Sequence, residues 1–335
     1  MIYSTRKQAE TSEKLWIARE QQKSFSVHQF AEVDLTGLKD HQDYFRSIVL
    51  QANGTELRGV YRQRITKEQG YDGELNGIKW TDTGSKPETW FEKIVQGNLG
   101  FENHLIVNEQ GDYQVLTFEH ATRGLLLVDL QTANMQRIGR QGDGLYFYAV
   151  SQNGQTDVVS IPNRFNSEPF RVWHHRIISQ SDQVTSKRRV LDAHHGSRPV
   201  SVAGRNNEII TLVRRVDQQR QLSYLLLRED DDNKAEQLLP IRSAARKVSN
   251  IAVTPDGRCF VASIDQSKQL SLCTVDSSGH IKQELISEGP LQQPFRASVT
   301  ECLVLRLTQN GHPEICLFAD GPNGSSISIY QQESR

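Results

Sequence analysis

The chain has 335 residues, and its 39 lysines and arginines nearly balance its 40 aspartates and glutamates, which gives a formal net charge of −1. This balance excludes a general electrostatic attraction to nucleic acid or to an anionic membrane surface. The mean hydropathy is −0.56, and no apolar run is as long as a membrane span. We therefore expect a soluble protein without a transmembrane segment.

The first 23 residues are predicted to form a tail or a short helix. The stretch from Ser12 to Gln22 is mostly polar. It also lacks the apolar core and the small-residue cleavage site of a secretory signal peptide, which favours a cytoplasmic location and leaves export without a cleaved signal open. Residues 24–44 follow, and the alternation from Phe25 to Phe30 is typical of a strand.

One pattern then recurs along the chain. A short apolar run leads into a tight turn, often Asn-Gly or Asp-Gly, and one or two further apolar runs follow. The clearest copy runs from Ile251 to Val275, with the turn Pro255-Asp256-Gly257. Such turns favour hairpins, and apolar runs between them favour strands. The turn residues recur about every 50 residues, at Gly54, Gly111, Gly154, Asn207, Gly257 and Gly311.

The segment from Tyr71 to Gly100 fits this pattern least well. It is rich in glycine and charge, and its one apolar run lies between Trp90 and Val95. We interpret it as the long outer part of the first repeat, with an inserted loop at Thr81–Lys86.

Repeats of this length, each with about four short strands, are typical of β-propeller blades. The sequence therefore predicts an all-β protein, a propeller of six or seven four-stranded blades spanning residues 24–335. Residues 24–44 would supply the strand that closes the ring or would belong to a seventh blade, because an open ring leaves strand edges exposed. A pair of β-sandwiches with coincidental turn spacing is the alternative.

The best repeat also resembles a known superfamily. Its segment from Ile251 to Arg258 is similar to the hairpin of TolB-like, WD40 and lactonase-type propellers. The resemblance covers about one blade in six and reaches no specific family. It implies the fold and not an activity, because many hairpins favour a Pro-Asp-Gly turn.

The four cysteines lie in the last quarter of the chain, and no pair has the spacing of a zinc or redox motif. They are Cys259, Cys273, Cys302 and Cys316. The first two flank a polar turn almost symmetrically and could face each other across a hairpin. We expect free, buried thiols that pack as small apolar side chains.

Two histidine doublets are the most notable polar residues, namely His174-His175 and His194-His195. Neutral imidazoles suit divalent metals, and some propeller lyases hold such a metal in the central channel. Neighbouring residues of a strand point to opposite faces, so one histidine of each doublet could face a given site. His104 and His120 are candidates for a further ligand. Surface or turn histidines without a metal are the alternative.

The sequence assigns no catalytic residue and no cofactor. We therefore predict a non-enzymatic propeller, a rigid platform whose loops bind a protein partner and whose N-terminal tail helps to dock it. The alternative is a carbohydrate-active or lactone-type enzyme, or a glycan-binding lectin, with its site in the central channel. In that case the two histidine doublets hold a metal or act in catalysis, and Asp192 orients them.

Overall fold

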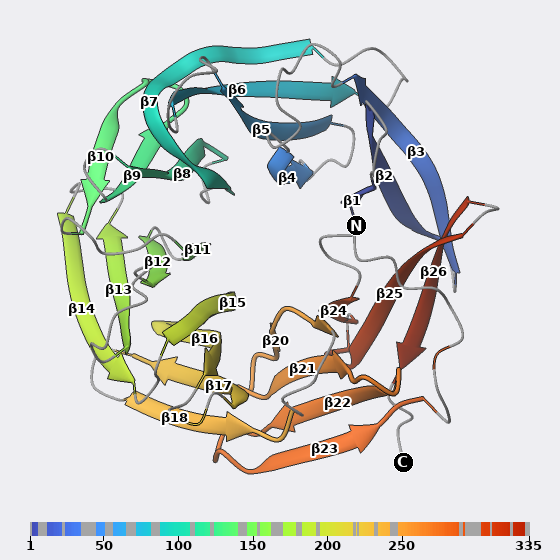
Figure 1. Cartoon of the computed structure of the whole chain (residues 1–335). Helices are drawn as coiled ribbons and strands as arrows, with labels where there is room; N and C mark the ends of the chain where they lie inside the picture. Colours follow the sequence, from blue (N-terminus) through green and yellow to red (C-terminus); the bar gives the residue numbers. More distant parts are fainter. Residues whose placement is uncertain are drawn as a thin grey trace.

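The computed structural model forms a ring of antiparallel sheets (Figure 1). It describes residues 2–5, 12–21, 24–34, 45–50, 56–64, 72–81, 88–107, 111–120, 124–139, 146–152, 155–161, 170–178, 183–191, 195–216, 219, 221–230, 234–241, 247–287, 291, 303–308, 310–321 and 324–331. Every regular element in these ranges is a strand, and none of them contains a helix that could span a membrane. The predicted all-β propeller is confirmed.

The strands follow one another around the ring in chain order. They are β1 (Ile2–Thr5), β2 (Ser12–Gln21), β3 (Ser24–Asp34), β4 (Phe45–Leu50), β5 (Glu56–Arg64), β6 (Asp72–Thr81), β7 (Glu88–Val107), β8 (Tyr113–Glu119), β9 (Gly124–Asp129), β10 (Met135–Ile138), β11 (Tyr146–Gln152), β12 (Gln155–Ile161), β13 (Phe170–Ile178), β14 (Gln183–Leu191), β15 (His195–Arg205), β16 (Glu208–Val216), β17 (Leu222–Glu229), β18 (Lys234–Leu239), β19 (Lys247–Val248), β20 (Ala252–Val253), β21 (Cys259–Ile264), β22 (Leu270–Val275), β23 (Ile281–Leu285), β24 (Leu303–Leu307), β25 (Pro313–Gly321) and β26 (Gly324–Gln331).

Among the described residues these strands make six hydrogen-bonded sheets. The sheets are β1–β3, β4–β10, β11–β14, β15–β18, β19–β23 and β24–β26. The seven-stranded sheet joins two four-stranded units, because the first half of β7 pairs with β6 and its second half pairs with β8. Counting those units separately gives seven blade-like units, within the predicted range of six or seven. In Figure 1 the strands β4, β11, β15 and β20 lie toward the centre of the ring.

Four of the six predicted turn residues lie in the described ranges, each between consecutive strands, and Gly54 and Gly154 lie outside those ranges. Gly111 joins β7 to β8, Gly257 joins β20 to β21, and Gly311 joins β24 to β25, all with positive φ. Asn206, next to the predicted Asn207, has a φ of 49° in the β15–β16 turn. These backbone angles explain why glycine and asparagine recur at these points.

The glycine-rich segment from Tyr71 to Gly100 holds two strands, β6 and β7, on either side of residues 82–87, which lie outside the described ranges. A glycine in this segment has a packing role. A Cβ atom on Gly77 would lie 2.2 Å from the ring of Phe91, its cross-strand partner. Because Gly77 has no side chain, the ring of Phe91 can lie over β6 at this point.

The hydrophobic core consists of layers between neighbouring sheets. One layer joins sheets β11–β14 and β15–β18 and includes Val159 and Leu225. The next joins β15–β18 to β19–β23 and includes Leu212 and Val261. Because the sheets that share these layers are apolar on both faces, their strands hold continuous buried runs, as in the six buried residues of β21. This explains why the strands appeared in the sequence as apolar runs.

The N-terminal region differs from the prediction. The predicted tail or short helix of residues 1–23 contains the strands β1 and β2. Residues 24–34 form β3, which pairs with β2 and not with β26. The first sheet is thus built locally, and the ring closes where β3 lies beside β26 (Figure 1). The sequence of β2 is mostly polar. Because a polar run resembles a solvent-exposed tail, this strand was not predicted.

Three of the four cysteines lie in the described residues, and all three are buried thiols outside disulfide bonds, as expected. Cys259 lies opposite Val275, and Cys273 lies opposite Val261, so the predicted facing pair is offset by two residues. Burial raises the pKa of the Cys259 thiol to about 11 and that of Cys273 to about 12. Both therefore pack as neutral side chains. Cys302 lies outside the described ranges.

Candidate functional site

A cluster of charged side chains lies where sheet β11–β14 meets sheet β15–β18. Its centre is Asp157, at the start of β12, whose side chain is 0% exposed. The antiparallel register places Asp157 opposite Arg176 and Val159 opposite His174. Since side chains alternate along a strand, His174 and Arg176 share the face of β13 on which Asp157 lies.

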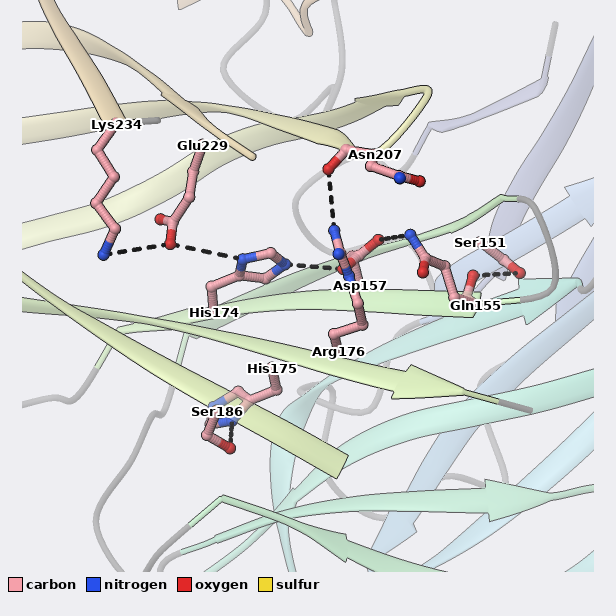
Figure 2. Close-up of polar contacts among 10 residues, drawn as sticks. All are labelled: Ser151, Gln155, Asp157, His174, His175, Arg176, Ser186, Asn207, Glu229 and Lys234. Carbon is pink, nitrogen blue, oxygen red and sulfur yellow. Dashed lines mark hydrogen bonds and ion pairs between the residues drawn. The ribbon is translucent and has the colours of Figure 1, made fainter. Parts of the chain in front are cut away.

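Three donors surround the Asp157 carboxylate (Figure 2). Its Oδ1 accepts hydrogen bonds from His174 Nε2 at 2.8 Å and from Arg176 Nε at 2.9 Å. Its Oδ2 accepts one from Gln155 Nε2 at 3.2 Å. A buried carboxylate is stable only with such charged and polar partners. Asp157 therefore also fixes the orientation of the His174 ring.

The cluster crosses to the next sheet at two points (Figure 2). His174 Nδ1 lies 3.9 Å from Glu229 Oε1 at the end of β17, and Lys234 Nζ at the start of β18 lies 3.4 Å from the same oxygen. Arg176 Nη2 donates to the main-chain oxygen of Asn207 at 3.0 Å. The end of β17 thus faces the histidine of the first sheet, and the β15–β16 turn contacts its arginine.

The protonation of His174 follows from this setting. Burial alone would lower its pKa, but the hydrogen bonds and charges of Asp157 and Glu229 together raise the pKa above its ordinary value. Burial would raise the pKa of Glu229, and His174 and Lys234 lower it instead. The cluster therefore favours an imidazolium between two carboxylates, a group able to release and recover a proton.

His175 points to the opposite face of β13 and has the opposite character. Its Nε2 lies 3.2 Å from Ser160 Oγ and its Nδ1 lies 2.9 Å from Ser186 Oγ. Its ring is stacked on Trp173, with 8° between the planes. Burial, and the nearby charge of His174, lower its pKa to about 4. A neutral imidazole donates at one nitrogen and accepts at the other, which two hydroxyls satisfy.

The structure describes the side chains of the first predicted doublet and not those of the second. His174 and His175 lie back to back, as strand alternation requires. His194 lies outside the described residues, and His195 begins β15 with its side chain outside them. No group of three described histidine, cysteine, aspartate or glutamate side chains could hold a metal ion. The further candidate His104 packs edge-on against Tyr148 instead, with 5.8 Å between ring centroids.

The sequence pointed to His174 and missed its partners. The predicted orienting residue Asp192 lies outside the described ranges, and Asp157 fills that role. One signal was available: Asp157 directly precedes the apolar run from Val158 to Ile161, where an aspartate is unusual unless it is paired. Glu229 had no such signal, since it begins an acidic stretch typical of a solvated loop.

Comparison with known proteins establishes the fold. No protein-family model and no curated protein matches the sequence. Two structures described as putative 6-phosphogluconolactonases are similar. That from Bacteroides uniformis has a TM-score of 0.57 at 11% identity, over 98% of this chain and 94% of that one. That from Bacteroides fragilis has a TM-score of 0.52 at 10% identity, over 98% and 92%.

The alpha-L-arabinanase of Penicillium chrysogenum, solved with arabinobiose, has a TM-score of 0.50 at 12% identity, over 87% of this chain and 93% of that one. At such low identity these likenesses show the β-propeller fold and leave activity to the site.

The predicted role as a non-enzymatic interaction platform is contradicted by these comparisons. The three solved structures named above share the fold over most of both chains and are described as an arabinanase and as putative lactonases, which are enzymes. The alternative prediction, a carbohydrate-active or lactone-type enzyme, agrees with them better. Its expected place in the central channel differs from the cluster described above, which lies on the second and third strands of its sheets.

Proposed function

We propose that this propeller is a lactone-type or carbohydrate-active hydrolase and that His174 is its proton-transfer group. The observation that carries the proposal is the placement of His174 between the buried Asp157 and the partly exposed Glu229. A histidine fixed by a buried carboxylate is a common general base and acid in hydrolysis. The propeller structures described as an arabinanase and as lactonases support the substrate class.

The distances suggest how the two ring nitrogens divide the work. Nε2 is committed to Asp157 at 2.8 Å. Nδ1 lies 3.9 Å from Glu229 Oε1, which is longer than a direct hydrogen bond and leaves Nδ1 able to bind a water or a substrate oxygen. Lys234, whose side chain is 43% exposed, lies beside Glu229 on the solvent side. Substrate would approach from there.

In lactone hydrolysis water attacks the carbonyl carbon, the ring carbon–oxygen bond breaks, and the leaving oxygen takes a proton. His174 Nδ1 would accept the proton of the attacking water and return it to the leaving oxygen. Asp157 would stabilise the imidazolium formed in between. A glycosidase with two reacting carboxylates fits less well, because both oxygens of Asp157 already accept hydrogen bonds within the protein.

The test is turnover by the purified full-length chain. Sugar lactones are assayed by proton release, and nitrophenyl arabinofuranosides serve as the glycoside arm. His174→Gln should lower kcat by roughly 10²- to 10⁴-fold and should remove the rise of kcat with pH that deprotonation of His174 gives. The exposed His280 provides the matched control, His280→Gln, which should keep wild-type activity.

Two results would overturn the proposal. One is that neither substrate class reacts faster than its spontaneous rate. The other is that folded His174→Gln turns over substrate like the wild type, with the same pH profile.

A further inference from the structure

Two arginines converge on the β20–β21 turn, between sheets β15–β18 and β19–β23. A Cβ atom on Gly257 would lie 2.1 Å from Arg205 Nη1 and 3.6 Å from Arg228 Nη2. The Arg205 guanidinium therefore takes the place that a side chain at residue 257 would fill, with the Arg228 guanidinium beside it. Like charges this close need a compensating negative charge.

Glu208 compensates for Arg228. Arg228 Nε donates to Glu208 Oε1 at 2.8 Å, and Arg228 Nη2 donates to Oε2 at 3.0 Å. This two-point contact occupies both carboxylate oxygens in the geometry that arginine favours. Hydrogen bonding to Glu208 raises the pKa of Arg228, so this guanidinium stays charged.

Arg205 is left without a counter-charge. It lies opposite Glu208 at the end of the β15–β16 hairpin, but the Glu208 carboxylate is engaged with Arg228. Within the described residues Arg205 makes no ion pair, and its buried Nε has no hydrogen-bond partner. A partly buried cation without a partner costs free energy that a bound anion would recover.

We propose that Arg205, with Arg228 beside it, binds a small oxyanion, a phosphate or carboxylate group, at the β20–β21 turn. The planar guanidinium presents paired donors that match such oxygens. The nearby Cys259 does not compete as an anion, because burial raises its pKa to about 11. Asp256, in the same turn, is bound by Thr254 and by Arg258.

This site is separate from the proposed hydrolytic cluster. Arg176 contacts the β15–β16 turn from sheet β11–β14, whereas Arg205 leaves the same hairpin toward Gly257 of the following sheet. Anion binding is measured without turnover. Failure of one proposal therefore does not decide the other.

The experiment is calorimetric titration of the full-length chain with inorganic phosphate, against sodium chloride of matched ionic strength. Phosphate should bind the wild type with a saturable heat that chloride does not give. Arg205→Gln should bind phosphate roughly 10- to 100-fold more weakly, the loss expected for one charged hydrogen-bonding group. The matched control is Arg258→Gln, because Arg258 is exposed and engaged with Asp256; it should keep wild-type affinity.

Two further measurements keep the proposal open to refutation. Arg205→Gln should unfold at the same or a higher temperature than the wild type without phosphate, since it removes an uncompensated charge. Gly257→Ala should also weaken phosphate binding, because its methyl group displaces Arg205 Nη1, whereas Gly111→Ala, with nothing within 4 Å of the new Cβ, should not. Equal heats in phosphate and chloride, or full phosphate affinity in Arg205→Gln, would rule the site out.

Discussion

At the scale of single residues, adjacent side chains in β13 have opposite electrostatic roles. His174 and His175 follow each other in sequence, yet carboxylates raise the pKa of the first while burial lowers the second to about 4. The difference arises because strand alternation sends the two rings into different sheet-to-sheet spaces. Residue type alone therefore says little about charge at this doublet.

The first prediction concerns Asp157, which accepts bonds from His174 and Arg176 while fully buried. Asp157→Asn leaves the arginine without its charged partner, and breaking a buried pair costs about 3 kcal/mol or more. We expect that loss in the free energy of unfolding, measured by urea denaturation. Asp112→Asn, at a position near the surface of the β7–β8 turn, is the control and should change it by about 0.5 kcal/mol or less.

The second prediction concerns pH. Burial lowers the pKa of His104 from 6.5 to about 4, so the unfolded chain binds this proton more readily than the folded one. The stabilisation is complete above pH 6.5 and is lost as the pH falls toward 4, by up to about 3 kcal/mol. His104→Phe keeps the aromatic contact with Tyr148 and should reduce the loss of unfolding free energy between pH 6.5 and 4.5. A slope identical to that of the wild type would contradict this.

At the scale of elements, one short segment ties three sheets together. The main-chain nitrogen of Ile251 donates to Ser201 Oγ on β15 at 3.0 Å. The Asn250 side chain donates to the Leu305 oxygen on β24 and accepts from the Leu305 nitrogen, both at 2.9 Å. An asparagine side chain thus replaces a backbone partner between the innermost strands.

The third prediction follows from this link. Asn250→Ala removes both bonds to Leu305, and we expect a loss of about 1–2 kcal/mol, about that of two ordinary hydrogen bonds. Urea denaturation measures it, and Asn134→Ala in the exposed turn after β9 is the control. If Asn250→Ala lowered the free energy of unfolding no more than the control does, the two hydrogen bonds to Leu305 would make no net contribution to stability.

At the scale of the whole molecule, the ring depends on the contact between its first and last sheets. Strands β3 and β26 lie side by side without sharing a backbone ladder. Backbone hydrogen bonds therefore stabilise each sheet internally, whereas the first and last sheets of the ring are joined without such bonds between their described residues. The first sheet lies between the last sheet and sheet β4–β10 in the ring (Figure 1).

The fourth prediction tests that closure. Deleting residues 1–34 removes β1–β3 and leaves the faces of sheets β4–β10 and β24–β26 uncovered. We expect self-association in size-exclusion chromatography and a broader, less cooperative urea transition than in the intact chain. Deleting residues 332–335, after β26, is the control. A monomeric deletion variant with a sharp transition would show that the remaining sheets close the ring alone.

The sequence by itself determined the strands and turns of the repeats, because turn chemistry and apolar runs are local. Gly111, Gly257 and Gly311 each need a positive φ that few other residues tolerate. In the first sheet the alternation from Phe25 to Phe30 predicted the strand β3, whereas β2 was missed because it is mostly polar and has no such turn signal. In the candidate site, the sequence singled out His174 as part of a histidine doublet, but it did not predict that this histidine is charged.

Only the tertiary structure decided what these residues contact. Asp157 and Glu229 meet at His174, and Arg205 meets Gly257, although each pair is separated by about 50 residues or more of chain, one blade length. The physical reason is that the sheets β11–β14, β15–β18 and β19–β23 pack face to face, so polar side chains at these layers find their partners in the next sheet of the ring. Local patterns build the blades, and the packing between blades creates the sites.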